Sequence, residues 1–453
     1  MRTGTRFCFD GNVDFTQGPI TQEIIHFAVP IMLGELLQNL YNSVDSLIVG
    51  NYVGDIALGA VSVCGTLSYL IIGFFTGISI GASVVISRAF GRNDRKKLSE
   101  SMQAAFSFAV LLGLILSALG IVFAPNLLSL AAVKEAAWTT AVTYLRIYLA
   151  GILFTIIYNV GAGILRAIGD TQTPFYILVV ACVVNIVLDL FLTGVLGFGV
   201  AGVGIATVGA QALSVLLVYQ QIKKKSESFT LSFRQLSEQK RIIADIMRVS
   251  IPSGIQNSLI SLSNLFVWRF VNGFDMAAAA GVGVAQRLDR FVAVPGRAIG
   301  LALTTLVSQN DGAGKNARIA DGIRKGIMLA LASTLVISAA FYIFSDASVA
   351  IFNDNPAVIE IGSTMMRTLI PFYTLMVMRE IMLGMMRGFG DTKVPMILSL
   401  IGMVGIRQIY LAVSMQLDRS IVHIYYCYPI TWGLTLLMTV IYYLICYKNG
   451  RPI

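Results

Sequence analysis

Charge is scarce in this sequence. Only 13% of its 453 residues are Asp, Glu, Lys or Arg, whereas 56% are hydrophobic and the mean hydropathy is +0.77. Soluble globular domains have about 25% charged residues. The composition therefore excludes an ordinary water-soluble domain and indicates a chain that lies mostly in lipid.

Motifs for metals, phosphates and export signals are also lacking. The two histidines, His26 and His423, are far apart in the sequence, and the five cysteines have no metal-ligand spacing. The Gly-rich stretch 197–204 lacks the Lys-Ser/Thr of a phosphate-binding loop. Residues 1–18 have no apolar core of a signal peptide, so we expect none to be cleaved. These absences argue against a metal centre, an ATP site and a catalytic dyad, and no cofactor is expected apart from a coupling ion.

Long apolar segments occupy most of the chain. Each is long enough for the about 20 residues that a helix needs to cross a bilayer. Backbone groups in lipid must be satisfied within the segment, which favours helices over strands. The sequence predicts an all-α bundle of twelve transmembrane helices, at roughly 24–50, 57–87, 101–124, 136–165, 174–196, 200–221, 248–272, 279–309, 325–345, 357–386, 395–416 and 421–447.

The two halves of the chain repeat each other. The stretch Arg166-Ala-Ile-Gly-Asp-Thr-Gln-Thr-Pro174 recurs 221 residues later as Arg387-Gly-Phe-Gly-Asp-Thr-Lys-Val-Pro395. Six spans per half is an even number, so the halves are parallel repeats, an architecture that suits alternating-access transport. The predicted organisation is an N-terminal segment 1–22, a first lobe 23–221, a connector 222–247, a second lobe 248–447 and a tail 448–453.

Basic residues gather in alternate loops, while the opposite loops hold only Lys134 and Arg419. By the positive-inside rule, both termini and the connector are cytoplasmic. Topology thus accounts for the net charge of +9, and nucleic-acid binding is not expected. We expect a monomer in the cytoplasmic (inner) membrane, with a connector that is either a solvated linker or an amphipathic helix on anionic lipid.

Polar groups inside apolar spans are costly, and each is by default a functional candidate. The first predicted helix carries a polar stripe, namely Glu35, Gln38, Asn42 and Asp45. Glu35, Gln38 and Asn42, together with Tyr41, are candidates for the substrate cavity. Asn185 and Asp189 are four residues apart on one face of the fifth helix, and Thr207 lies on the sixth. The rise of a helix places Asp45, Asp189 and Thr207 at similar depth below the outer surface.

These side chains can form one site. Two carboxylates in a low-dielectric cavity repel each other, so the pair can bind a proton, a sodium ion or an organic cation. The structural alternative is that Asp45 and Asp189 only pair with nearby polar groups. Thr207 can likewise bond carbonyls of its own helix.

The second half does not repeat this chemistry, because Val267 and Tyr410 stand where the first half has Asp45 and Asp189. Its spans carry arginines and the acids Asp289 and Glu380, which we interpret as structural ion pairs. Contact of Glu380 with substrate is a further hypothesis. Met376 and its neighbouring methionines are interpreted as core filling or as an adaptable apolar surface.

The repeated loops have a structural interpretation. Aspartate after glycine commonly stabilises tight turns. We therefore predict that Asp170 and Asp391 bond local backbone or the nearby arginines and do not act in transport. The motif residues are Arg166, Gly169, Asp170, Arg387, Gly390 and Asp391.

The segment Pro30–Gly50 and both Gly-Asp-Thr loops resemble the multidrug and toxic compound extrusion (MATE) family, over roughly residues 20–447. Within it, the chain is most similar to the DinF-like branch. The resemblance implies a proton-linked site at Asp45, Asn185 and Asp189, with Thr207 beside it. It argues against the sodium site of the NorM-like branch, because residues 251–272 contain no acid and Met376 replaces an aspartate.

The resemblance implies export of bulky, amphiphilic, often cationic drugs in exchange for protons or sodium. Two alternatives stay open. A flippase for lipid-linked precursors shares the superfamily fold, and its cavity is expected to present cationic groups to pyrophosphate. An enzyme acting on polyprenyl substrates would need acidic or histidine clusters at the membrane surface, which the sequence does not offer.

Overall fold

The computed structural model describes residues 13–130, 135–226, 229–231, 236, 238–448 and 451–452. The first half contains α1 (Ile20–Tyr52), α2 (Asp55–Gly91), α3 (Arg95–Leu130), α4 (Glu135–Ala167), α5 (Gln172–Asp189), the π-helix η1 (Leu190–Val195) and α6 (Gly199–Lys225). The second half contains α7 (Lys240–Val271), α8 (Met276–Gly312), α9 (Asn316–Ile343), α10 (Ser345–Ala350), α11 (Pro356–Leu369), the 3-10 helix η3 (Ile370–Phe372), α12 (Tyr373–Gly388), α13 (Lys393–Leu400), the π-helix η4 (Ile401–Ile406), α14 (Arg407–Leu417) and α15 (Val422–Cys446). A two-residue antiparallel pair follows, β1 (Tyr447–Lys448) and β2 (Arg451–Pro452).

The predicted all-α membrane fold in two repeats is confirmed. Eleven helical segments of the described chain are long and apolar enough to cross a bilayer. The twelfth predicted span, 248–272, lies in α7, which is 32 residues long but is not among the eleven. Polar side chains such as Ser250, Gln256 and Asn257 lower its apolar character. Lys134 and Cys8 lie outside the described residues.

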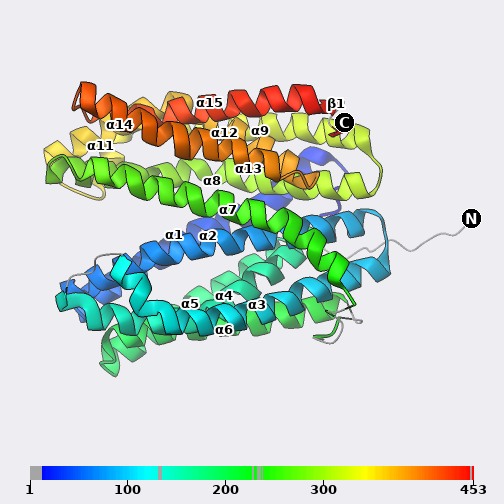
Figure 1. The fold of residues 1–453 in the computed structure, drawn as a ribbon, viewed down its shortest axis with the longest axis horizontal. Coiled ribbons are helices and arrows are strands. Elements are labelled where there is room, and N and C mark those ends of the chain that lie inside the picture. Colours follow the sequence, from blue (N-terminus) through cyan, green and yellow to red (C-terminus); the bar gives the residue numbers. More distant parts are fainter. Residues whose placement is uncertain are drawn as a thin grey trace, which may run out of the picture. The chain divides into compact units, whose positions relative to one another are not determined.

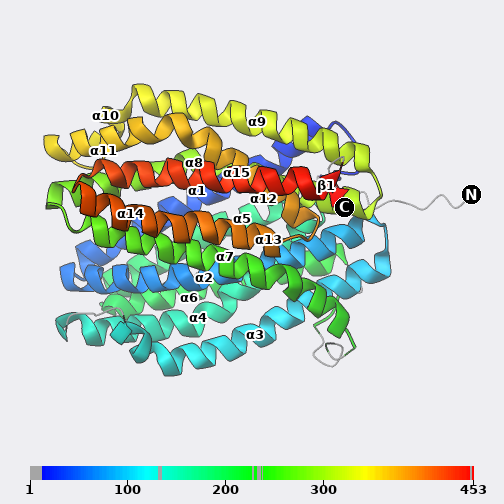
Figure 2. The ribbon, with the colours of Figure 1, turned by 45° about the horizontal axis from the view of Figure 1, so that its top comes forward.

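The chain folds into two compact units, each built around one central helix. In the first unit, α4 packs against α2, α3 and α6 (Figure 1). In the second, α8 packs against α9, α11 and α12 (Figure 2). Ser87 Oγ donates to the Ala167 carbonyl at 3.2 Å, and 221 residues later Ser308 Oγ donates to the Gly388 carbonyl at 2.8 Å. The same interhelical hydrogen bond therefore recurs in both repeats.

The boundaries of the compact units differ from those of the predicted lobes. Among the described residues, the first unit comprises those from 13 to 14 and from 33 to 254, and the second comprises those from 15 to 32 and from 255 to 452. α1 therefore begins in the second unit and ends in the first, whereas α7 does the reverse. Each change of unit comes three residues after a proline, Pro30 or Pro252. Proline removes a helical hydrogen bond and commonly kinks a helix.

Short segments are held on one unit or the other. Phe15, Thr16 and Gln17 form hydrogen bonds within the second unit. For example, Asn310 Nδ2 and Arg318 Nε each donate to the Phe15 carbonyl at 3.0 Å. In the connector, Phe229 is fully buried in the first unit between the rings of Phe106 and Tyr219. This part of the connector is therefore packed against protein and is not a solvated linker.

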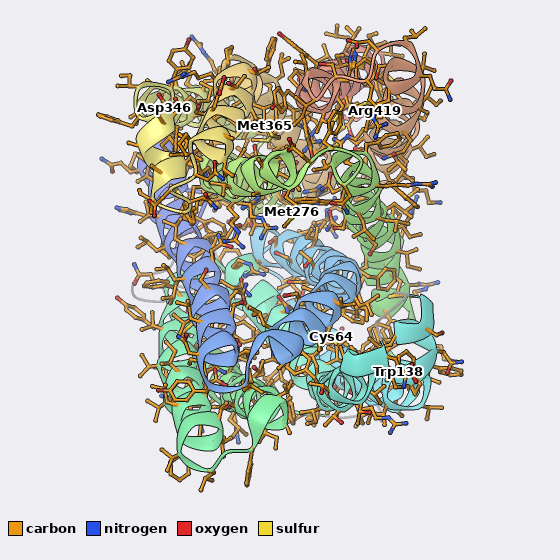
Figure 3. The ribbon with its side chains drawn as sticks, turned by 90° about the vertical axis from the view of Figure 1, so that its left-hand side faces the viewer. Cys64, Trp138, Met276, Asp346, Met365 and Arg419 are labelled. Atoms are coloured by element: carbon orange, nitrogen blue, oxygen red, sulfur yellow. The ribbon has the colours of Figure 1, made fainter. Side chains whose placement is uncertain are left out.

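Three loops of the second unit lie at one end. Met276 begins α8, Asp346 lies in α10 and Arg419 lies between α14 and α15, and all three are at the end that faces the viewer in Figure 3. A hydrogen bond from Ser363 and an ion pair with Arg367 at 2.6 Å hold the pKa of the exposed Asp346 carboxyl below its usual range.

Candidate functional site

The first unit brings Asp45, Asn185, Asp189 and Thr207 together. In the amide orientation that satisfies both of its ends, Asn185 Nδ2 donates to Asp45 Oδ1 and to Asp189 Oδ2, each at 3.1 Å. Asn185 Oδ1 accepts from the Thr207 backbone N–H at 3.2 Å. One amide thus bridges two carboxylates from α1 and α5 and ties them to α6.

Local sequence positions these groups. Asn185 and Asp189 share one face of α5 because they are four residues apart, and both are buried. α5 ends at Asp189, where the π-helix η1 begins. π-helical turns are rare and frequently occur at functional sites. The side chain of Thr207 bonds the Val203 carbonyl of its own helix at 3.0 Å, so only its backbone N–H faces the amide.

The surroundings of the carboxylate pair favour binding of a proton or a cation. The two carboxyl groups are close enough to interact directly, and Tyr41 interacts with Asp45 and Thr207. Asp189 Oδ1 is buried and has no hydrogen-bond partner among the described residues. A buried carboxylate oxygen without a partner is costly, and a proton or a cation would relieve that cost.

The amide orientation bears on which ion fits. Asn185 presents its N–H groups to both carboxylates and turns its oxygen toward Thr207. Sodium requires oxygen ligands, and the two carboxylates offer such oxygens. A proton needs only a carboxylate oxygen such as Asp189 Oδ1. No group of three or more His, Cys, Asp or Glu able to hold a metal occurs in the part of the chain that the structure describes.

The remaining first-helix candidates are placed apart from this pair. Glu35 is ten residues from Asp45, about 15 Å along α1. It interacts electrostatically with Arg166, whose Nη2 donates to Ser79 Oγ at 3.1 Å. Gln38 is exposed and Asn42 is half-buried on the intervening turns. The structure therefore joins Tyr41 to the acidic pair and joins Glu35 to the Arg166 loop.

The repeated loops are two copies of one turn. Gly169 and Gly390 have φ of 88° and 78°, and the Asp170 and Asp391 N–H groups bond the carbonyls five residues back at 2.9 and 3.0 Å. This pattern is the Schellman ending of a helix, which favours glycine at the left-handed position. The turn explains why the motif recurs.

The predicted local backbone bond is present at Asp170, but the arginines predicted as partners are replaced by more distant side chains. Asp170 Oδ1 accepts from the Thr173 backbone N–H at 2.9 Å, and its other oxygen pairs with Lys225 at 2.5 Å instead of Arg166. Asp391 Oδ2 accepts from Tyr442 at 2.7 Å and from Tyr447 at 2.9 Å, instead of pairing with Arg387. Each aspartate therefore fastens its turn to the end of the last helix of its repeat.

The second-half candidates form a different group. Glu380 pairs with the neighbouring Arg379, which also contacts the sulfur of Met403. Met376 is buried, as core filling would require. At the equivalents of the acidic pair, Val267 is buried and Tyr410 lies within 3.4 Å of His423.

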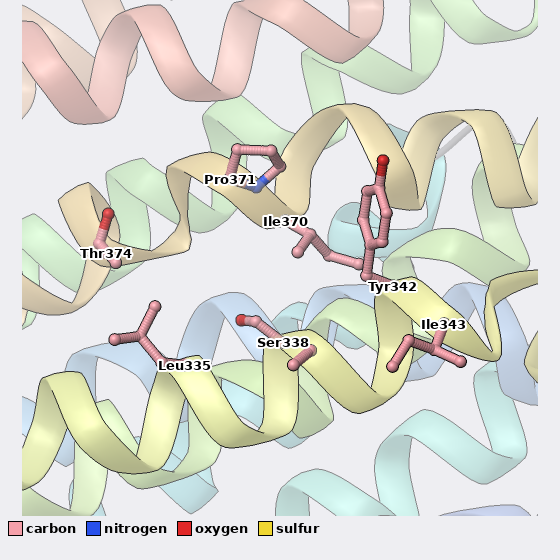
Figure 4. A pocket seen from close by; sticks show the side chains of 8 residues that line it. Leu335, Ser338, Tyr342, Ile343, Ile370, Pro371 and Thr374 are labelled. Carbon is pink, nitrogen blue, oxygen red and sulfur yellow. The ribbon is translucent and has the colours of Figure 1, made fainter.

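An apolar groove of about 410 Å³ lies apart from these charged groups (Figure 4). It runs between α9 and the segment 370–374, and its lining residues carry no charge: Leu335, Ser338, Ala339, Tyr342, Ile343, Ile370, Pro371 and Thr374. Leu335 and Ile343 are more than half exposed. A groove of this composition suits lipid contact better than recognition of a charged molecule.

Known proteins resemble this chain along most of its length. The profile of the family described as MatE matches residues 30–191 and 252–413, one match in each half. The probable multidrug resistance protein YoeA of Bacillus subtilis is 29% identical over 434 residues, covering 94% of each chain. The probable multidrug resistance protein NorM of Thermotoga maritima is 27% identical over 397 residues, covering 84% of this chain and 83% of its own. A solved structure described as the outward-facing conformation of a multidrug resistance MATE family transporter has a TM-score of 0.89 at 22% identity, covering 97% of this chain and 98% of its own.

Proposed function

This chain belongs to the MatE family of multidrug and toxic compound extrusion transporters, a family of membrane transporters of small molecules and not of enzymes. From that premise we propose that it is a secondary active antiporter, which exports amphiphilic cationic compounds in exchange for protons by alternating access. The DinF-like branch remains part of this proposal.

One observation carries the proposal, namely the Asn185 amide that bridges Asp45 and Asp189. A proton and a substrate cation compete for the same negative charge, so that binding of one lowers the affinity for the other. Protons entering from outside then favour release of the cation. Exchange follows without any covalent step, and no cofactor is needed beyond the coupling ion.

The proton is the preferred coupling ion over sodium. The buried Asp189 Oδ1 is available to a proton, whereas the Asn185 oxygen is engaged by the Thr207 N–H and is turned away from the carboxylates. A sodium ion that used the amide oxygen as a ligand as well would require that amide to rotate, which would break its three hydrogen bonds.

The proposal includes an orientation in the cell membrane. Both termini and the connector 222–247 face the cytoplasm, and the monomer is the transporting species. The uneven distribution of basic residues between alternate loops supports this orientation.

A flippase for lipid-linked precursors is the second candidate, because the second unit contains two buried arginines, Arg379 and Arg407. Such groups would suit a pyrophosphate. The antiporter remains the conclusion, since an amide-bridged carboxylate pair serves ion exchange and has no evident use in binding a pyrophosphate.

The test is transport of a fluorescent cation in proteoliposomes, with a pH gradient or a sodium gradient imposed separately. For exchange of one proton per cation, one pH unit corresponds to about 1.36 kcal/mol and a tenfold concentration ratio. We expect that ratio with the pH gradient alone, and its loss in Asp45→Asn and in Asp189→Asn.

Asp321→Asn is the matched control, because Asp321 is an exposed carboxylate that pairs with Lys325 on the surface of α9. It should transport as the unchanged protein does. Accumulation driven by sodium alone, or normal proton-driven accumulation in both Asp45→Asn and Asp189→Asn, would refute the mechanism.

A further inference from the structure

The second unit contains a charged cluster in which arginine predominates. Its members interact electrostatically with one another and lie on α8, α12 and α14. They are Asp289, Arg290, Arg297, Arg379, Glu380, Arg387 and Arg407. Five arginines thus face two carboxylates, and ion pairing within the cluster leaves positive charge in excess.

Arg407 is the clearest member. It is fully buried, and it is the largest side chain in that state among the described residues. Its Nη1 donates to Asn264 Oδ1 at 2.7 Å, its Nη2 donates to Thr431 Oγ1 at 3.2 Å, and its guanidinium lies 5.0 Å from the Tyr428 ring centroid. These partners are neutral. They orient the guanidinium without cancelling its charge.

Buried donors of the cluster remain unused. The Nε atoms of Arg379, Arg387 and Arg407 are buried and have no hydrogen-bond partner among the described residues. Unsatisfied buried N–H groups are rare in proteins because each costs free energy. One acceptor of the cluster, Asp289 Oδ1, is likewise buried without a partner, so three unused donors stand against one unused acceptor and donors are in excess.

Two further arginines make the cluster accessible. Arg290 and Arg297 are exposed, although both lie in the interior of α8, which is long and apolar enough to cross the bilayer. Arginine at such depth is costly in lipid and almost always faces protein or a water-filled cavity. Arg297 interacts electrostatically with both Asp289 and Glu380, so it links the two carboxylates of the cluster.

Arg387 repeats Arg166 of the first half, but the other charges of the cluster are not a consequence of the duplicated fold. At the repeat offset, Arg407 corresponds to Ile186, Arg379 to Tyr158 and Glu380 to Asn159. A scaffold of the same design therefore folds without these charges. Their cost in the second unit is explained by a ligand of opposite sign.

We propose that the second unit binds an anionic group, a carboxylate or a phosphate, on the transported molecule. The proposal rests on the transport function above and refines its substrate class. The cargo is amphoteric: besides the cationic part that exchanges with protons, it carries an anionic part that the arginine cluster recognises.

Binding to the full-length protein in nanodiscs of zwitterionic lipid tests this proposal without any gradient. The probes are a xanthene dye with a free carboxylate and its methyl ester, which retains the cationic ring but has lost the anion. We expect Arg297→Gln to weaken binding of the carboxylate dye about tenfold, as loss of a charge-assisted hydrogen bond predicts. Binding of the ester should be unchanged, and Arg297→Lys should restore part of the affinity.

Arg367→Gln is the matched control, because Arg367 pairs with Asp346 outside the cluster. Equal affinity of the two dyes for the unchanged protein would overturn the proposal, as would equal effects of Arg297→Gln and Arg367→Gln. Competition with benzoate or phenyl phosphate then identifies the anion, and failure of both to compete also counts against the site.

A lipid headgroup is the remaining source of phosphate. If phosphatidylglycerol in the nanodisc displaces the carboxylate dye, the cluster is a lipid site and the proposal is wrong. Failure of antiport is distinguishable, since the ester would then not accumulate under a pH gradient while the two dyes would still bind with different affinities.

Discussion

Replacement of Gly169 by alanine tests how the first Gly-Asp-Thr turn is held. Gly169 has φ of 88°, and a Cβ there would lie 1.8 Å from the Val13 carbonyl oxygen. Left-handed backbone costs about 1–2 kcal/mol for a residue with a Cβ. Val13 must also move, which breaks its 3.1 Å hydrogen bond to Gly169 and exposes a buried side chain.

The two losses at Val13 can be estimated. A backbone hydrogen bond contributes about 1 kcal/mol, and burial of a valine side chain contributes about 1.5 kcal/mol. Gly314→Ala is the matched control. Gly314 has φ of 70° and ends α8 in the same type of turn, and a Cβ added there would have no other atom within 4 Å. Gly169→Ala should therefore destabilise by about 2.5 kcal/mol more than Gly314→Ala.

The assay is thermal loss of the monodisperse peak in detergent, measured by fluorescence-detected size exclusion. A shift of roughly 2–4 °C per kcal/mol is expected for units of about 200 residues. Gly169→Ala should thus lower the midpoint roughly 5–10 °C further than Gly314→Ala. Equal midpoints would refute the reasoning. In a chain shortened to begin at Asp14, the two variants should become equivalent, because the Val13 contact is then missing from both.

Three further predictions concern other parts of the molecule. Ser226→Cys, in a chain whose other cysteines have been replaced, should not react with an impermeant thiol reagent in intact cells but should react in inverted vesicles. Labelling from outside would contradict a cytoplasmic connector. Burial and, to a lesser extent, Asp391 raise the pKa of Tyr447, so the stabilisation from this tyrosine is complete below about pH 10 and is lost as the pH rises further. Asp391→Asn should reduce this alkaline component in a pH series of thermal midpoints, because the contribution of burial remains; an unchanged alkaline component would contradict the contact. Glu380→Gln should retain proton-driven transport, since Glu380 pairs with Arg379 in the second unit; loss of coupling in a folded Glu380→Gln protein would contradict a coupling site confined to the first unit.

Helical periodicity accounts for what the sequence could predict of the site. Spacing of four residues places Asn185 and Asp189 on one face, and the rise per residue gives Asp45 and Thr207 a similar depth. Those two rules suffice to nominate the cluster. They do not tell which end of the Asn185 amide faces the carboxylates, because that depends on a donor from another helix, the Thr207 N–H.

Contacts between distant segments were beyond sequence reasoning. Lys225 pairs with Asp170 across 55 positions of the chain, and nothing in the local pattern distinguishes it from the other lysines of its run. The partners of Arg407 are equally remote in sequence. A duplicated motif predicts that two turns have the same backbone conformation. Their aspartates have different partners because the sequences around them differ between the repeats.

The exchange of helix halves at Pro30 and Pro252 bears on how such a chain could be divided or could have arisen. A cut within the connector would leave each fragment with the beginning of a helix whose packing partners are on the other fragment. A half-length protein of this design would face the same problem. It would be complete only as a pair of copies that swap the first part of their opening helix, a form of association that fusion into one chain makes permanent.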